Sequence, residues 1–202
     1  YTPVSTNAQH GSFDLLVKCY ADGGLSKILG DTPIGDTSIA FKHIDFNVKL
    51  QYPFHKKRIG MIAGGSGITP MLQALQALIG VHGDTAEEIR LLYGNKTSDD
   101  ILCKDLLEAW ALRDDRFTVT HVLSEEKVGQ GMEVKVGQGM EMGFIDDEMI
   151  SRHLFAEPDD DTIVFLCGPP PMYDTLCGPR GEPEVGGVLA NMGYDESHVY
   201  KF

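Results

Sequence analysis

Hydrophobic and polar positions follow two different rhythms along this chain. In residues 12–20 apolar side chains occupy every second position, which is the period of a half-buried strand. The first part of the chain is predicted to form strands over residues 12–20, 36–41 and 46–50 and a short helix over residues 25–29. Short strands around one helix, without regular alternation of strand and helix, indicate a small antiparallel sheet or barrel.

From Arg58 onward, apolar runs alternate with segments of helical period. The predicted strands cover residues 58–63, 89–93, 117–123 and 162–167, and the predicted helices cover residues 70–79, 98–112 and 146–154. Strands that read as continuous apolar runs are typical of a parallel sheet covered by helices on both faces. We therefore expect a mixed β and α/β fold. The remainder of a small antiparallel barrel, residues 1–55, precedes a parallel-sheet α/β domain, residues 56–202.

The charge of the chain is strongly negative and unevenly distributed. Among 202 residues, 17 basic and 30 acidic side chains give a formal net charge of −13. A polyphosphate is repelled by such a charge, so we expect no nucleic-acid partner. Residues 1–58 carry 7 basic and 5 acidic side chains, whereas residues 59–202 carry 10 and 25. This step indicates two regions whose surfaces serve different purposes.

Cysteine and histidine do not form the patterns that bind metals. The four cysteines show no CxxC spacing and the seven histidines are scattered. We therefore expect no metal site, and reduced thiols in a cytosolic-type compartment. The sequence contains no apolar run long enough to span a membrane and no visible signal peptide.

The strongest chemical signal is a glycine-rich turn between an apolar strand and a helix. It reads Gly64-Gly65-Ser66-Gly67-Ile68-Thr69-Pro70. Glycines let the backbone approach a ligand closely, and a helix N-terminus offers free N–H groups to a diphosphate. Pro70, which suits the first helical position, stands where the usual dinucleotide fingerprint has its third glycine, and the next strand ends in Gly94-Asn95 without an acidic residue. These departures favour a different nucleotide-binding fold.

A second signal follows the last buried strand and reads Cys167-Gly168-Pro169-Pro170-Pro171-Met172. The carboxyl ends of parallel strands are where such sheets bind ligands. Taken alone, the segment is equally well explained as a core strand that ends in a proline-rich stop, with Cys167 as a small buried apolar residue.

Both motifs, in this order and spacing, resemble the flavoprotein pyridine-nucleotide reductases of the ferredoxin reductase superfamily. The opening Tyr1-Thr2-Pro3-Val4-Ser5 and Phe202 agree with this resemblance. The chain is most similar to the NADH–cytochrome b5 reductases, with the flavin segment of assimilatory nitrate reductase close behind. The resemblance implies an FAD-binding barrel followed by an NADH-binding domain. It also implies hydride transfer from NADH to FAD and then single-electron transfer to a haem protein such as cytochrome b5.

The resemblance also implies roles for individual residues. Thr69 and Cys167 would frame the contact between the two rings as catalytic residues. The implied FAD contacts are Tyr1, Thr2, Val17, Lys18, Tyr20, Gly24, Leu25 and Ser26. The implied pyridine-nucleotide contacts are Gly64, Gly65, Gly67, Thr69, Pro70, Gly168, Pro169, Pro170 and Met172. The Arg that holds the FAD phosphate in this family would lie two residues before Tyr1, so we expect the given sequence to hold FAD weakly.

Further expectations concern specificity, partner and location. In this family the adenosine ribose faces the end of the strand Phe117–Leu123, where Ser124, Glu125 and Glu126 follow; two carboxylates there predict NADH over NADPH. The acceptor would be cytochrome b5 or a similar haem protein with an acidic face, docked near residues 1–58. We expect a monomer on the cytosolic face of the endoplasmic reticulum or the mitochondrial outer membrane, with membrane contact only through a segment upstream of Tyr1.

Three readings remain open. The chain is a cytochrome b5 reductase, or the reductase segment of an assimilatory nitrate reductase, or a nucleotide-binding fragment without activity. A seven-residue run that recurs in residues 127–133 and 135–141 is assigned no function.

Overall fold

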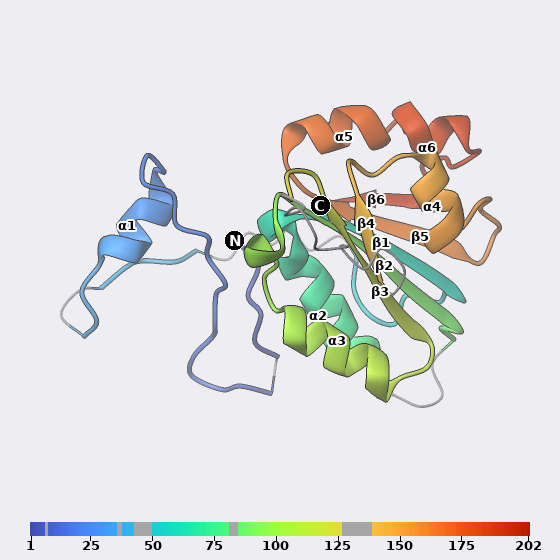
Figure 1. Ribbon diagram of the computed structural model, residues 1–202. Coiled ribbons are helices and arrows are strands. Elements are labelled where there is room, and N and C mark those ends of the chain that lie inside the picture. Colours follow the sequence, from blue (N-terminus) through green and yellow to red (C-terminus); the bar gives the residue numbers. More distant parts are fainter. Residues whose placement is uncertain (7, 36–37, 43–49, 81–84, 127–138) are drawn as a thin grey trace, which may run out of the picture.

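A computed structural model describes residues 1–6, 8–35, 38–42, 50–80, 85–126 and 139–202 of the chain. Residues from Arg58 onward form a six-stranded parallel sheet in the order β4-β3-β2-β1-β5-β6 (Figure 1). The strands are β1 Arg58–Gly64, β2 Glu88–Asn95, β3 Phe117–Leu123, β4 Met140–Met142, β5 Thr162–Cys167 and β6 Val199–Lys201. The α-helices are α1 Leu25–Asp31, α2 Ile68–Leu78, α3 Lys104–Arg113, α4 Asp147–His153, α5 Pro170–Leu176 and α6 Gly187–Asn191. Two short 3₁₀ turns are η2 Gly65–Gly67 and η3 Ser98–Asp100.

Helices cover both faces of the sheet, as predicted. In β1, Ile59, Met61 and Ala63 pack into one core cluster together with α2 and α3. The intervening Ile62 belongs to a second cluster formed with α4, α5 and α6. Because successive side chains of a strand point to opposite faces, a strand buried on both faces must be apolar throughout, which explains the continuous apolar runs.

At one place in the sheet, between β1 and β5, the direction in which successive strands are added reverses. The chain moves from β1 to β2 and β3 on one side, and then returns to place β5 on the other side of β1. In open α/β sheets, ligands bind at such a switch point, beside the carboxyl ends of the two central strands. The glycine-rich turn follows β1 and the proline-rich turn follows β5, so both lie at this point.

The predicted fold class and all four predicted strands of the α/β part are confirmed, but two helix starts differ. Helix α2 begins at Ile68 rather than Pro70, because η2 leads directly into it. Pro70 still lies in the first turn, where a missing N–H breaks no helical hydrogen bond. The helix predicted over residues 98–112 is divided into η3 and α3, because Cys103 adopts a left-handed conformation with φ 57°.

Four short elements were not predicted. They are β4, β6, α5 and α6, of three, three, seven and five residues. Elements this short show too few periods of hydrophobic alternation for a pattern to be read from the sequence.

The first part of the chain differs from the prediction in its strands. Helix α1 confirms the expected short helix and stands to one side of the α/β unit (Figure 1). Residues 12–20 do not form the expected strand, and their one ladder contact is an isolated antiparallel bridge between Pro3 and Leu15. A strand needs a neighbour to pair its backbone groups, and among the described residues no strand lies beside this segment.

Other expectations for the first part fall partly outside the described residues. Residues 38–41 form no strand, while residues 36–37 and 43–49 are not described, and neither is most of the repeated segment 127–141. The described N-terminal residues pack on the α/β unit: the Gln76 side chain donates to the Val4 carbonyl at 2.8 Å, and Leu16 and Phe54 contact the core beside α2. None of the helices in the described ranges is long and apolar enough to cross a membrane.

Candidate functional site

The two predicted motifs are in direct backbone contact. A β carbon on Gly67 would lie 2.1 Å from the carbonyl oxygen of Cys167 and 3.0 Å from the amide nitrogen of Gly168. Atoms this close exclude any side chain at position 67. The turns that follow β1 and β5 therefore form a junction of backbone against backbone at the switch point, the place where open α/β sheets bind ligands.

Met172 covers this junction from α5. A β carbon on Gly64 would lie 2.8 Å from the Cε atom of Met172 and 2.8 Å from the Cδ atom of Pro169. One on Gly168 would lie 2.5 Å from the Sδ atom of Met172. The predicted nucleotide contacts Met172 and Pro169 thus also have a packing role, since they occupy the space that the two glycines leave open.

The N-terminus of α2 is directed into the same junction. Gly67 precedes this eleven-residue helix, and no side chain caps its end. Thr69 and Pro70 are buried in the first turn, where the Thr69 hydroxyl donates to the Ser66 carbonyl at 3.3 Å. The Ile68 N–H is bonded to the Gly65 and Ser66 carbonyls and Pro70 has no N–H, so this helix end favours a phosphate oxygen mainly through its partial positive charge.

Strand β2 supplies two polar side chains that the sequence analysis did not identify. The buried Tyr93 hydroxyl donates to the Gly65 carbonyl at 2.9 Å. Asn95, at the carboxyl end of β2, is only 8% exposed, and neither polar atom of its amide has a hydrogen-bond partner among the described residues. Leaving a buried polar group unpaired costs roughly 1–3 kcal/mol. Such a group fits a site that is completed by a ligand.

The predicted catalytic residues Thr69 and Cys167 both lie at the junction, on α2 and at the end of β5. Burial raises the pKa of the Cys167 thiol above its ordinary value. The thiol is therefore protonated at neutral pH and serves as a small neutral group rather than a nucleophile.

The predicted FAD contacts lie along the N-terminal segment. Lys18 reaches the carboxyl edge of the sheet, where its Nζ atom lies 2.8 Å from a carboxylate oxygen of Asp100 in η3. Gly24, Leu25 and Ser26 begin α1, which the structure does not bring against the glycine-rich turn (Figure 1). Thr2 and Val17 are half-buried.

The segment that carries these FAD contacts exposes several large apolar side chains. They are Tyr1, Phe13, Tyr20, Leu25 and Ile28, each about half exposed or more. A ring system finds apolar surface to contact here, so the residues present fit a flavin.

The polar groups at the end of β3 are arranged differently from the expectation. Glu126 accepts hydrogen bonds from the Ser98 N–H at 2.6 Å and the Ser98 hydroxyl at 3.2 Å, so its carboxylate holds the turn after β2. Glu125 is exposed and lies 2.8 Å from the Lys96 ammonium. Of the two carboxylates, only that of Glu125 is therefore directed outward, and it is paired with the Lys96 ammonium.

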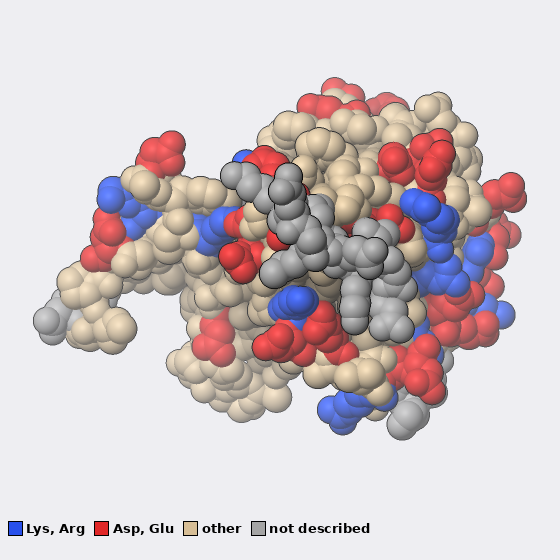
Figure 2. All heavy atoms as spheres, in the orientation of Figure 1, with Lys and Arg blue, Asp and Glu red and all other residues tan. Residues whose placement is uncertain are grey.

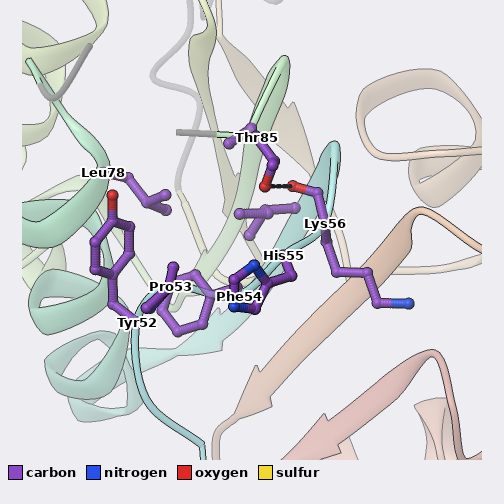
Figure 3. Close-up of a pocket in the computed structure, with 9 residues that line it drawn as sticks. Tyr52, Pro53, Phe54, His55, Lys56, Leu78 and Thr85 are labelled. Atoms are coloured by element: carbon purple, nitrogen blue, oxygen red, sulfur yellow. Dashed lines mark hydrogen bonds between the residues drawn. The ribbon is translucent and has the colours of Figure 1, made fainter. Parts of the chain in front are cut away.

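Two other features lie away from the junction. A small pocket between residues 52–56 and the start of β1 is lined by Tyr52, Phe54, Leu78 and Thr85 (Figure 3), at the amino edge of the sheet. The basic residues beside it pair with acidic neighbours: Arg58 with Asp159 at 2.8 Å, and Lys57 with Glu87 and Asp161 at 3.6 and 3.8 Å. In the described part of the chain, no three His, Cys, Asp or Glu residues are grouped as metal ligands.

The fold is that of a dinucleotide-binding α/β domain, with the junction at its switch point. Sequence comparison agrees: the oxidoreductase NAD-binding domain family matches residues 61–178, and the oxidoreductase FAD-binding domain family matches residues 1–64. NADH-cytochrome b5 reductase 1 of Dictyostelium discoideum is 37% identical over 202 residues, covering 100% of this chain and 63% of its own length. NADH-cytochrome b5 reductase 2 of Yarrowia lipolytica is 36% identical, covering 100% of this chain and 67% of its own length.

A solved structure shows the same relationship. The cytochrome b5 reductase domain of Ulva prolifera nitrate reductase is 34% identical, with a TM-score of 0.73, over 98% of this chain and 77% of that domain. The chain belongs to the NADH-cytochrome b5 reductase family. It spans 63% and 67% of the length of the Dictyostelium discoideum and Yarrowia lipolytica reductases.

Proposed function

We propose that this chain is the FAD- and NADH-binding part of a reductase that delivers electrons from NADH to a haem protein. The observation that carries the proposal is the contact between Gly67 and Cys167, which forms a bare-backbone junction at the switch point of the sheet. Bound FAD supplies the chemistry, because it accepts a hydride and releases its electrons singly.

The protein residues would bind, orient and exclude water. The N–H groups of η2 would bind the diphosphate of NADH at the start of α2, because this helix end is positively polarised and no side chain caps it. Thr69 and the neutral Cys167 thiol would flank the reacting rings and hold them in register without taking part in proton transfer. Pro169, Pro170 and Met172 would close the junction from the α5 side.

The acceptor is proposed to be cytochrome b5 or a similar haem protein, as in the named relatives. We propose that it docks on the side of the N-terminal segment, because residues 1–58 carry 7 basic and 5 acidic side chains whereas residues 59–202 carry 10 and 25. Figure 2 shows acidic side chains distributed over the α/β unit, with basic side chains interspersed among them and also present on the α1 side.

A second candidate is the reductase segment of an assimilatory nitrate reductase. The similarity to the Ulva prolifera domain favours it. Both candidates share the same first half-reaction, and they differ in the protein that receives the electrons.

The test uses the full-length protein. We expect purified protein to show flavin absorbance that NADH bleaches without oxygen, and to reduce cytochrome b5 in stopped-flow measurements. Nitrate reduction by the same preparation would favour the second candidate. A colourless protein that binds NAD⁺ without reducing any haem acceptor would identify an inactive nucleotide-binding fragment and overturn the proposal.

Three further expectations remain proposals. They are a domain boundary between residues 55 and 56, a monomeric state, and attachment to the cytosolic face of the endoplasmic reticulum or mitochondrial outer membrane. Analytical ultracentrifugation and cell fractionation of the full-length protein would test the last two.

A further inference from the structure

The carbonyl of the Gly65–Ser66 peptide accepts a hydrogen bond from a buried tyrosine on the neighbouring strand β2. Tyr93 is fully buried and lies opposite Ala63 in the register of β1 and β2. Its hydroxyl reaches past the end of β1 and donates to the Gly65 carbonyl at 2.9 Å. Burial raises the pKa of Tyr93 to about 12, so this donor keeps its proton throughout the physiological pH range.

The turn that receives this hydrogen bond is rich in glycine, and within it the Ile68 N–H also donates to the Gly65 carbonyl. Three of the four residues from Gly64 to Gly67 are glycines, and Gly65 adopts a positive φ of 53°. Glycine makes many backbone conformations accessible at similar energy. The Tyr93 hydroxyl adds to the contacts within η2 a hydrogen bond from outside the turn, and this bond favours one of these conformations.

The hydrogen bond also determines where the next N–H points. In a trans peptide the C=O and N–H of one unit are coplanar and point in opposite directions. Because the Gly65 carbonyl is directed at Tyr93, the Ser66 N–H is directed away from β2. Ser66 is exposed, whereas Gly67, Ile68 and Thr69 after it are buried, so this N–H belongs to the open side of the turn.

We propose that Tyr93 is a positioning residue that presents the Ser66 N–H to the diphosphate of the pyridine nucleotide. This inference rests on the proposed function, in which the turn binds NADH. Without the tyrosine hydroxyl, the turn would populate conformations in which this N–H is misdirected. The apparent affinity would then fall in proportion to the fraction of turns that remain competent.

The test removes only the hydroxyl. In the full-length protein, Tyr93→Phe should weaken NAD⁺ binding in calorimetry about tenfold, the size expected for one lost hydrogen bond. The KM for NADH should rise by a similar factor while kcat at saturating NADH stays unchanged. A loss of kcat without a change in KM or NAD⁺ affinity would overturn the proposal.

Tyr194→Phe is a matched control. Tyr194 is also buried, its hydroxyl donates to the Phe155 carbonyl at 2.6 Å, and burial raises its pKa to about 12. This variant should lose similar thermal stability and keep the parent affinity for NAD⁺. Equal weakening in both variants would show a general structural effect and overturn the proposal. If the parent protein itself does not bind NAD⁺, the proposed function fails and this inference fails with it.

Discussion

The ammonium group of Lys18 lies 2.8 Å from a carboxylate oxygen of Asp100, and this contact joins the N-terminal segment to the turn after β2. Asp100 is itself held in place, because it accepts hydrogen bonds from the Thr97 hydroxyl and N–H. The Lys18 hydrogen bond is the main cause that lowers the pKa of Asp100. A cation expected to contact cofactor is thus positioned at the carboxyl edge of the sheet.

Replacing Lys18 should weaken cofactor binding and change the free energy of unfolding only slightly. We expect Lys18→Met to weaken FAD binding about tenfold, because a charge-assisted contact contributes roughly 1.5–3 kcal/mol. The ion pair itself is about one-third exposed, so Asp100→Asn should change the free energy of unfolding by no more than about 1 kcal/mol. Flavin fluorescence titration and denaturant titration measure the two effects. Lys27→Met, at an exposed pair in α1, is the control.

Gly67 should tolerate no side chain. In Gly67→Ala the new β carbon would meet the Cys167 backbone at 2.1 Å, so the junction must open. We expect a loss of unfolding free energy of about 1–3 kcal/mol and no measurable NAD⁺ binding. Gly181→Ala is the control, since a β carbon there meets no atom within 4 Å. Parent-like NAD⁺ affinity in Gly67→Ala would show that the junction is not the nucleotide site.

Asp114 predicts a pH dependence of stability. Its carboxylate lies 2.9 Å from the Arg116 Nε atom and 2.8 Å from Nη2, and the Arg116 guanidinium holds the pKa of this carboxyl well below its usual range. Because the folded pKa is lower than the unfolded value of about 3.9, the pair stabilises the fold above roughly pH 4. That stabilisation is lost as the pH falls below this value.

We expect Asp114→Asn to lower the free energy of unfolding at pH 7 by about 2–3 kcal/mol, as for hydrogen bonds to a charged group. The difference from the parent should shrink as the pH falls below about 4. Denaturant titrations across this range measure it, with the exposed neighbour Asp115→Asn as the control. A difference that stays constant with pH would show that the carboxylate charge is not responsible.

Cofactor preference should depend on the exposed pair formed by Glu125 and Lys96 at the ends of β3 and β2. The carboxylate repels a 2′-phosphate and also engages the Lys96 ammonium, a cation that would attract such a phosphate. We expect the parent to prefer NADH, and Glu125→Gln to raise the catalytic efficiency with NADPH severalfold. Glu87→Gln, at a Lys–Glu pair on the opposite edge of the sheet, should leave the ratio unchanged. Equal efficiencies in the parent would show that Glu125 does not face the ribose.

Local sequence determined the longer strands and helices of the α/β part and the glycines of its proposed site. The strands at Phe117–Leu123 and Thr162–Cys167 have the predicted bounds, because an apolar run between polar turns is a local property. Gly64, Gly67 and Gly168 were identifiable for the same reason. A glycine beside a strand end marks a close backbone approach whatever its partner is.

Only the tertiary structure decided which residues from different strands and turns come into contact at the site. The contacts of Gly67 with Cys167, and of Tyr93 with the Gly65 carbonyl, depend on β5 returning to the far side of β1 and on β2 lying in register with β1. Sequence periodicity reports only which side of an element is apolar. It carries no information about strand order. Residues 12–20 show the same limit, because an alternating segment becomes a strand only where a neighbouring strand pairs with its backbone.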